Sequence, residues 1–273
     1  MDATARLCVM NLYLHGIGSD ESPVIVSDTL ASEPGDHFDL VLTNPPFGKK
    51  SSITVVNEEG EATKESLTYA RPDFFATTSN KQLNFVQHIH SLLQMNGAAA
   101  VVVPDNVLFE GGAGETIRRR LLKQCDVHTL LRLPTGIFYA QGVKANVLFF
   151  DKRAGREQPW TDKLWIYDLR TNKHFTLKTN PLKYNDLIDF IECYNVANRH
   201  ERKETERFRS FTYDELMQRD KVSLDIFWLK DDSLEDSANL PAPEILAQEI
   251  SENLQAALEQ FNSIYESLSA RNT

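Results

Sequence analysis

At the start of the chain, the spacing of hydrophobic and polar positions is first that of a helix and then that of strands. From Ala3 to Leu14 the apolar residues recur at the spacing of a helix, which Gly16 and Gly18 end. Val24–Val26 and Phe38–Leu42 are short apolar runs, the kind of pattern that predicts buried strands. The sequence therefore predicts one helix followed by two strands of a parallel sheet.

The alternation continues to about residue 151. Residues 49–78 are polar and aperiodic, which is typical of a long loop at the edge of a sheet. The elements expected beyond that loop are helices over Gln82–Met95, ended by Asn96-Gly97, and over Glu115–Gln124, and strands over Ala98–Val103, Val127–Leu133 and Val143–Asp151. This order predicts a doubly wound α/β sheet, in which ligands bind beyond the carboxyl ends of the strands.

The pattern changes after about residue 170. Tyr184–Val196 has helical periodicity, and a long helix is expected from Pro243 onward. That helix carries a heptad seam formed by Ala247, Ile250, Leu254, Ala257, Phe261, Ile264 and Leu268. The seam fits packing against its own chain and pairing with another subunit equally well. We expect a catalytic domain over residues 1–170 and a C-terminal helical extension over 171–273.

The composition is that of an ordinary globular protein. The chain has 273 residues, 41% hydrophobic and 25% charged, and its apolar runs are far shorter than the ~20 residues of a membrane helix. No signal pattern opens the chain, so we predict a cytoplasmic protein. Cys8, Cys125 and Cys193 are dispersed and odd in number, which predicts buried apolar residues and no disulfide. The seven histidines show no metal-ligand spacing, and none is assigned to a metal.

The segment Asn44-Pro45-Pro46-Phe47-Gly48 directly follows the predicted strand that ends at Leu42. Two prolines make the backbone rigid and leave carbonyl groups without competing N–H donors. The Asn44 side-chain oxygen and the Pro45 carbonyl are suited to accept both hydrogens of an aromatic exocyclic amine, which directs the nitrogen lone pair toward a methyl donor. Phe47 is suited to stack on a base flipped out of a duplex.

The Pro45-Pro46 pair and the Gly111–Gly114 segment also allow interpretations that involve no chemistry. The Pro45-Pro46 pair also fits a tight turn after a strand, with no chemistry attached. Gly111-Gly112-Ala113-Gly114 precedes a predicted helix, but it lacks the Gly-Lys-Ser/Thr ending and the GxGxxG spacing of phosphate-binding loops. We therefore interpret it as a turn that leads into the helix.

Residues 7–152 resemble the modification (M) subunit of Type I restriction-modification systems. The matching segments are Met10-Asn11-Leu12, His15-Gly16-Ile17, Asp28-Thr29-Leu30, Asn44-Pro45-Pro46-Phe47-Gly48, Pro104-Asp105-Asn106-Val107-Leu108-Phe109, Arg118, Leu133-Pro134-Thr135-Gly136-Ile137-Phe138 and Val143–Phe150. The resemblance implies a Rossmann-like S-adenosylmethionine-dependent methyltransferase sheet. It also implies that the chain methylates N6 of adenine in DNA.

The same resemblance implies roles for individual residues. Asn44, Pro45, Pro46 and Phe47 correspond to the catalytic motif, and Asp28 corresponds to a residue that contacts the adenine of the cofactor. Phe138 corresponds to a second aromatic residue that, with Phe47, stacks on the flipped base. Two alternatives stay open, because an Asp before a Thr commonly begins a turn or caps a helix, and a Phe between strands is commonly a core residue.

The chain departs from that family's pattern before Leu7. It contains no glycine-rich loop of the type Asp-Pro-x-x-Gly-x-Gly, no acidic residue after it for the cofactor ribose, and no N-terminal helical domain. We therefore expect a sheet that is incomplete at its N-terminal side, and a truncated or split form of the enzyme. S-adenosylmethionine binding by this chain alone is expected to be weak or absent.

The expected function is that of a methyltransferase subunit that acts on double-stranded DNA beside a specificity subunit, with a restriction subunit as a further partner. The formal net charge of −10 and the short basic stretches Arg118–Arg120 and Arg199–Arg209, which we interpret as solvated helix faces, suggest that a partner supplies much of the contact with DNA. Two other hypotheses are an inactive remnant that serves as a subunit-interaction module, and a protein glutamine N-methyltransferase.

Overall fold

The computed structural model describes residues 3–48, 52–56, 62–66, 68–138, 143–173, 175–177 and 179–231, with only the backbone of residues 52–56 and 62–66. The predicted helix from Pro243 and its heptad seam lie outside these residues. Within the described ranges, no helix combines the length and the hydropathy needed to cross a membrane.

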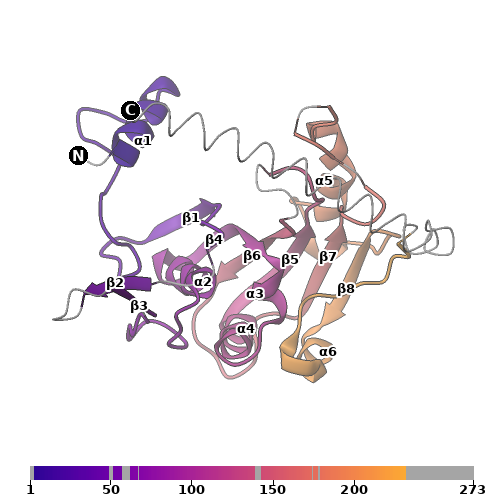
Figure 1. Cartoon of the computed structure of the whole chain (residues 1–273). Helices are drawn as coiled ribbons and strands as arrows, with labels where there is room; N and C mark the ends of the chain where they lie inside the picture. Colours follow the sequence, from indigo (N-terminus) through magenta and orange to yellow (C-terminus); the bar gives the residue numbers. More distant parts are fainter. Residues whose placement is uncertain are drawn as a thin grey trace, which may run out of the picture. The chain divides into compact units, whose positions relative to one another are not determined.

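A six-stranded sheet forms the centre of the described chain (Figure 1). Its strands are β1 (Phe38–Thr43), β4 (Leu93–Pro104), β5 (Cys125–Arg132), β6 (Ala145–Lys152), β7 (Lys163–Asp168) and β8 (Phe208–Thr212). They lie in the order β1-β4-β6-β5-β7-β8, and β2 (Ser52–Val56) and β3 (Ala62–Ser66) form a separate antiparallel hairpin. The β1–β4 and β5–β7 pairs are parallel, whereas β6 and β8 run antiparallel to their neighbours.

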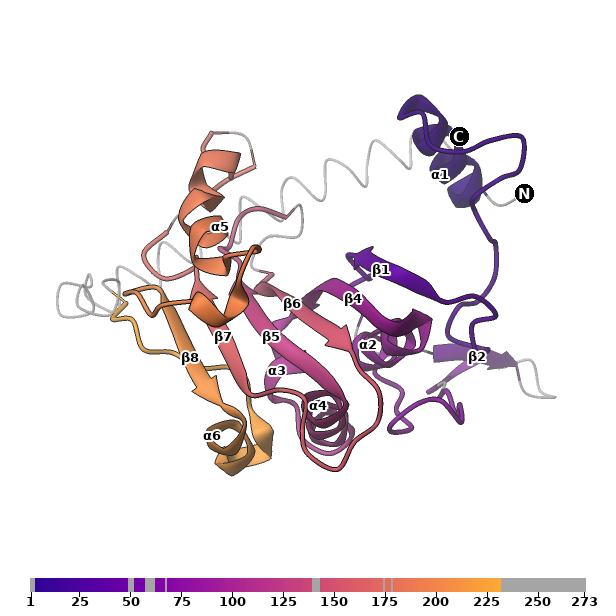
Figure 2. The ribbon, with the colours of Figure 1, turned by 180° about the vertical axis from the view of Figure 1, so that it is seen from behind.

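Helices cover both faces of the sheet (Figures 1 and 2). The helical segments are α1 (Ala3–Leu14), α2 (Lys81–Leu92), α3 (Asp105–Phe109), α4 (Ala113–Gln124), η1 (Tyr184–Leu187), α5 (Ile188–Tyr194), η2 (Arg199–Glu201), α6 (Tyr213–Gln218) and η3 (Asp220–Val222). Adjacent residues of a strand point to opposite faces. Accordingly, Leu130 packs with α2, α4 and α6 in one core, and Leu131 packs near η1 and α5 in the other.

The predicted elements are mostly confirmed, and the differences have physical causes. The α/β fold is confirmed, but the sheet is mixed and not wholly parallel, because β6 and β8 enter it in the reverse direction. The loop predicted over residues 49–78 contains the β2–β3 hairpin. The helix expected to end near Asn96-Gly97 ends at Leu92, where β4 begins at once. The turn reading of Gly111–Gly114 is confirmed, since α4 follows Gly112 directly.

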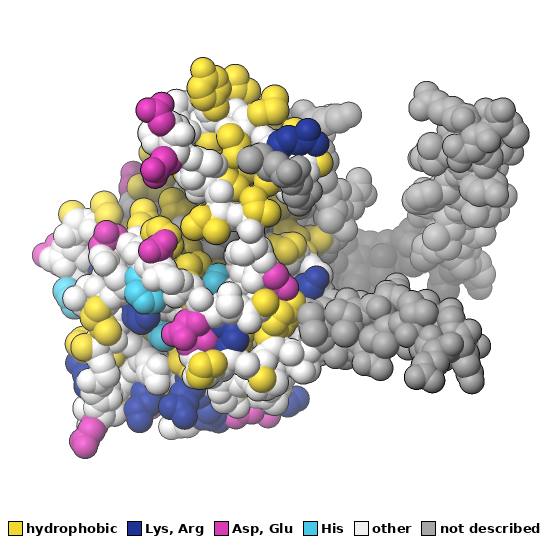
Figure 3. Space-filling model, turned by 90° about the vertical axis from the view of Figure 1, so that its left-hand side faces the viewer, with side chains coloured by type: hydrophobic (Ala, Val, Ile, Leu, Met, Phe, Trp, Pro, Cys, Tyr) yellow, Lys and Arg dark blue, Asp and Glu magenta, His cyan; other side chains and the backbone are white. Residues whose placement is uncertain are grey.

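The prediction of buried strands near the N-terminus is wrong in two places. Val24–Val26 is not a strand, and Ile25 and Val26 are 75% and 59% exposed. Phe38–Thr43 is a strand, but it lies at the edge of the sheet, with Leu40 58% and Leu42 69% exposed. Figure 3 looks onto this side of the molecule and shows hydrophobic side chains at its surface. The apolar composition predicted the strand correctly, but it did not predict that the side chains of Leu40 and Leu42 are exposed.

Burial also differs from expectation at individual residues. Cys8 is exposed, whereas Cys125 is buried as predicted and Cys193 is half-buried. Arg118 is buried and not on a solvated helix face. Its guanidinium donates to the backbone carbonyls of Val107, Glu110, Lys221 and Val222 at 2.7–3.0 Å. Arg118 therefore ties α3 to the segment around η3.

Contacts divide the chain into one unit of Met1–Trp228 and a second of Leu229–Thr273. The sequence placed the division at residue 170. The difference arises because β8 pairs with β7 from Lys163↔Thr212 to Tyr167↔Phe208, so the sheet takes in residues from the predicted extension. Nothing in the local pattern of residues 208–212 distinguishes a sheet strand from a short extended loop.

Candidate active site

The Asn44–Gly48 loop leaves the sheet at the carboxyl edge of β1. Thr43, the last residue of β1, lies in register with Val101 of the parallel strand β4. Pro45 and Pro46 line a small cavity of about 10 Å³ together with Gln82 and Val86 of α2 and Val102, Val103 and Pro104 of β4. The two prolines thus rest on the end of β4 and on the first turns of α2, with room between them for about one water molecule.

Asn44 is exposed at the start of this loop. Among the described residues, its side chain makes no hydrogen bond or ion pair. An exposed amide on a rigid proline-bounded loop keeps both its acceptor and its donors available for a ligand. The geometry therefore suits recognition of an amine from outside the protein.

Phe47 and Phe138 come together although they are far apart in sequence. Their ring centroids are 5.5 Å apart and their planes meet at 82°, an edge-to-face arrangement. Phe47 follows β1 and Phe138 follows β5, so both rings lie beyond the carboxyl ends of strands in the same sheet. Both side chains are half-buried and pack beside the core near α5. The structure thus places two of the predicted aromatic residues at one location.

Asp28 lies in a turn. Its Oδ1 accepts a hydrogen bond from the backbone N–H of Leu30 at 3.1 Å, which is the geometry of an Asx turn. Its Oδ2 lies 3.5 Å from the Tyr69 hydroxyl. The turn alternative weighed from the sequence therefore describes its local conformation, and a role at the cofactor stays a prediction. Within the described chain, Asp28 forms no hydrogen bond with the Asn44–Gly48 loop.

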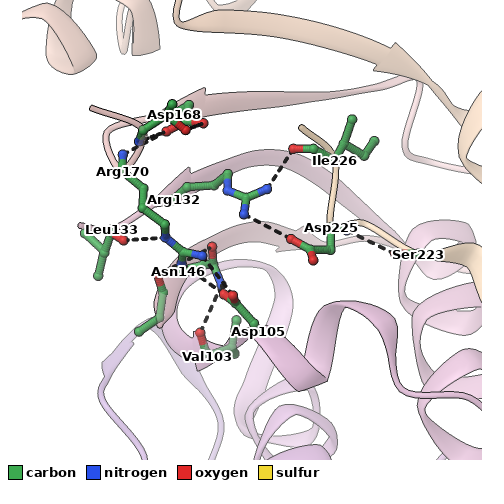
Figure 4. Close-up of polar contacts among 12 residues, drawn as sticks. Val103, Asp105, Arg132, Leu133, Asn146, Asp168, Arg170, Ser223, Asp225 and Ile226 are labelled. Atoms are coloured by element: carbon green, nitrogen blue, oxygen red, sulfur yellow. Dashed lines mark hydrogen bonds and ion pairs between the residues drawn. The ribbon is translucent and has the colours of Figure 1, made fainter. Parts of the chain in front are cut away.

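A polar cluster that the sequence did not predict braces the carboxyl edge of the sheet (Figure 4). Arg170 forms two hydrogen bonds with the Asp105 carboxylate, at 2.8 and 2.9 Å, and also donates to the carbonyls of Leu133 and Ala145. The Asn146 amide donates to Asp105 at 2.8 Å. These residues join the ends of β4, β5 and β7 to the start of β6.

The charge of Asp105 is set by this cluster. Burial raises the pKa of its carboxyl group, but the hydrogen bonds and positive charge of Arg170, together with the Asn146 hydrogen bond, outweigh burial and hold the pKa below its ordinary value. Asp105 is therefore an ionised residue that structures this edge. No sequence pattern points to the pair, because its partners lie 65 residues apart.

A cleft of about 740 Å³ lies at the opposite edge of the sheet, near the amino ends of β5 and β7. Arg153 and Arg199, which line it, both pair with the Asp151 carboxylate, at 2.9 and 2.7 Å. This cleft lies at the edge of the sheet opposite the Asn44–Gly48 loop, so its size does not make it the site of the Asn44 chemistry. Arg202 also lines it and is buried, which differs from the solvated helix face expected there.

The described residues fit a methyl donor in part. Asn44 and Pro45 lie beyond the carboxyl end of β1, at the edge where sheets of this kind bind their ligands. A glycine-rich turn between a strand and a helix, which lets backbone approach a nucleotide, is not found at this edge among the described residues. Gly16 and Gly18 have positive φ, but they follow the helix α1 and not a strand.

Comparisons with known proteins agree with this arrangement. The family model described as N-6 DNA methylase matches residues 1–226. The chain is 39% identical to the methylase subunit of the Type I restriction enzyme EcoKI of Escherichia coli K12, over 98% of this chain and 55% of that protein. It is 34% identical to the EcoEI methylase subunit of Escherichia coli over 69% of this chain and 36% of that protein. The chain thus spans about half the length of the curated relatives it matches.

Solved structures show the same similarity. The crystal structure of the EcoKI M protein matches 98% of this chain and 59% of that chain, with 36% identity and a TM-score of 0.72. A modification subunit of a putative Type I restriction enzyme from Vibrio vulnificus matches 76% of this chain and 41% of that chain, with 28% identity and a TM-score of 0.58. Fold, loop and relatives agree: the chain belongs to the N-6 DNA methylase family, and its fold is that of α/β methyltransferases.

Proposed function

We propose that this chain carries the target-base site of an adenine-specific DNA methyltransferase, which transfers a methyl group from S-adenosylmethionine to N6 of an adenine flipped out of duplex DNA. The observation that carries the proposal is the meeting of the exposed Asn44 loop with the Phe47–Phe138 ring pair at the carboxyl edge of the sheet. Membership of the N-6 DNA methylase family supports the choice of acceptor.

The roles of the residues follow from the chemistry of the acceptor. The lone pair of adenine N6 is delocalised into the ring, so it is a poor nucleophile. The Asn44 side-chain oxygen and the Pro45 carbonyl accept the two amino hydrogens, which localises the lone pair and directs it away from the ring plane. S-adenosylmethionine, when bound, supplies the electrophilic methyl group. Phe47 and Phe138 hold the base by stacking, which offsets part of the cost of removing it from the duplex.

The protein's charge supports a division of labour in this proposal. With a net charge of −10, the chain is unsuited to hold DNA phosphates alone. The relatives are named as methylase subunits of Type I restriction enzymes. We therefore propose a specificity subunit as the partner that supplies most of the DNA contact, a restriction subunit as a further partner, and the cytoplasm as the compartment.

The test is Asn44→Ala in the complex purified through a tag on this chain. Because Asn44 contacts the amine in the transition state, kcat should fall about 100-fold or more, while affinity for S-adenosylmethionine stays nearly unchanged. Asn185→Ala is the matched control, since Asn185 is an exposed asparagine in η1. Retention of more than about a tenth of the wild-type rate in Asn44→Ala would refute the assignment.

A further inference from the structure

A closed ring of polar side chains lies beside the Asn44–Gly48 loop. The Gln82 Oε1 accepts from the Asn106 amide at 2.8 Å, and the same amide lies 3.3 Å from the Glu110 carboxylate. The Asn80 amide donates to that carboxylate at 2.8 Å, while the Asn80 Oδ1 accepts from the backbone N–H groups of Gln82 and Leu83 and so caps α2. The ring thus joins the start of α2 to α3.

Among the described residues, a single hydrogen bond leads from this ring to the loop. The Gln82 Nε2 donates to the Phe47 carbonyl at 2.8 Å. Gln82 is 4% exposed, so the bond is shielded from water. The orientation of its amide is fixed because the Phe47 carbonyl can only accept, and the Asn106 NH2 group, which also faces the Glu110 carboxylate, can only donate. Gln82 is therefore held by α3 on one side and holds the loop on the other.

The Asn44–Gly48 loop offers few other backbone donors for hydrogen bonds. Pro45 and Pro46 have no N–H groups, so they cannot donate hydrogen bonds to the sheet or to the helices. They line a small cavity beside α2 and the end of β4. The Phe47 carbonyl belongs to the same residue whose ring meets Phe138, so fixing the carbonyl restricts where that ring points.

We propose that Gln82 is a positioning residue for the target-base site: through its bond to the Phe47 carbonyl it keeps the Phe47 ring, and with it the Pro45 carbonyl and Asn44, in the geometry that receives the flipped base. This role rests on the proposed methyltransferase function. Gln82 itself does not touch the base.

Gln82→Glu is the sharpest test. The introduced carboxyl keeps an oxygen for the Asn106 amide but turns an ionised oxygen toward the Phe47 carbonyl, so the bond to the loop becomes a repulsion. The site is buried and close to Glu110, and both conditions raise the pKa of a carboxyl group. On acidification the neutral carboxyl regains an O–H donor for the Phe47 carbonyl. Loss of activity in alkaline buffer with recovery in acid distinguishes positioning from a general loss of stability.

Gln87→Glu is the matched control. Gln87 lies on the same helix and is 1% exposed, and its amide bonds the backbone of Ala76, at 2.8 and 3.1 Å. It braces a different loop. The control therefore carries a similar buried substitution with no link to Phe47.

We expect Gln82→Glu to lower kcat about 10-fold or more at alkaline pH with KM for S-adenosylmethionine unchanged, and Gln87→Glu to stay within about twofold of wild type. Hydrogen exchange provides a readout independent of activity: Gln82→Glu should speed exchange in a peptide covering residues 43–48, and Gln87→Glu in one covering 74–78. Unchanged exchange at 43–48 would overturn the proposal. If exchange responds as expected but the wild-type complex methylates no DNA, the proposed methyltransferase function is refuted, while the role of Gln82 in holding the loop through the Phe47 carbonyl is retained. Equal loss of kcat in both variants would overturn the role in positioning.

Discussion

Replacing Arg170 by methionine tests how the carboxyl edge of the sheet is held together. The substitution keeps an apolar side chain of similar length but removes both bonds to Asp105 and the bonds to the Leu133 and Ala145 carbonyls. Both partners of the ion pair are shielded, with side chains 11% and 17% exposed. Breaking a buried pair by removing one partner costs about 3–5 kcal/mol.

We expect the lower end of that range. Asp105 keeps its hydrogen bond from the Asn146 amide at 2.8 Å, so its charge is not left wholly without a partner. The free energy of unfolding at neutral pH should therefore fall by about 3 kcal/mol. For a unit of this size, that corresponds to a decrease in Tm of about 6–12 °C.

The loss should depend on pH with a definite sign. In the wild type the pKa of Asp105 is lower in the folded protein than its ordinary value, so the ion pair stabilises the fold above the unfolded pKa of about 3.9, and this stabilisation is lost as the pH falls through the folded pKa. In Arg170→Met, burial is left as the main influence and raises that pKa. Acid then neutralises a poorly solvated carboxylate, which favours the folded variant. The difference in the free energy of unfolding between the wild type and Arg170→Met should therefore become smaller toward about pH 4.

Urea denaturation at neutral pH and near pH 4 measures both effects. Arg156→Met serves as a control, since Arg156 is exposed and its contacts are local: it donates to the carbonyls of Gln158 and Pro159 and lies over the Trp160 ring. Adding Asp105→Asn to Arg170→Met should restore part of the lost stability, because the uncompensated charge is gone. If Arg170→Met lowers the free energy of unfolding by less than about 1 kcal/mol at neutral pH, the reasoning is refuted. A difference between the two proteins that becomes larger in acid would also refute it.

Three further predictions concern other parts of the chain. Arg118→Met should lower the free energy of unfolding by about 3–5 kcal/mol in chemical denaturation, because four backbone carbonyls lose a buried cationic donor; a change within about 0.5 kcal/mol would contradict this. Leu254→Asp with Phe261→Asp, on the predicted heptad face, should weaken copurification of a partner subunit and leave the α/β unit folded by circular dichroism, whereas cooperative unfolding of the whole chain would place the helix in the core. Calorimetric titration of the isolated chain with S-adenosylmethionine should show about millimolar or weaker binding, because a glycine-rich turn between a strand and a helix is not found at this edge among the described residues; saturation at low micromolar concentration would contradict this.

The sequence singled out the Asn44–Gly48 loop because its signal is local. Two prolines after an apolar strand restrict the backbone of Asn44–Phe47 whatever the rest of the chain does. The nearness of Phe138 to Phe47 came from the family resemblance, and the ring contact gives it a physical form. The strand Phe38–Thr43 was also found from its composition.

Other features depend on partners far away in sequence. Whether Leu40 and Leu42 are covered depends on which element packs against their face of β1, and hydropathy carries no information on that. The antiparallel entry of β8 and the Arg170–Asp105 pair likewise arise only when distant segments meet. Gln82 lies in a helix whose periodicity was recognised, but its partner, the Phe47 carbonyl, lies 35 residues away.

The identity of the methylated atom tests the central claim most directly. The complex purified through this chain is incubated with duplex DNA and S-adenosylmethionine carrying a labelled methyl group, and the DNA nucleosides and the protein peptides are then separated and analysed by mass spectrometry. We predict label in N6-methyladenine with the wild-type chain, and labelling slower by about 100-fold or more with Asn44→Ala. Label on protein glutamine, on another base, or labelling of adenine by the Asn44→Ala complex at more than about a tenth of the wild-type rate would contradict the proposal that this loop receives adenine N6.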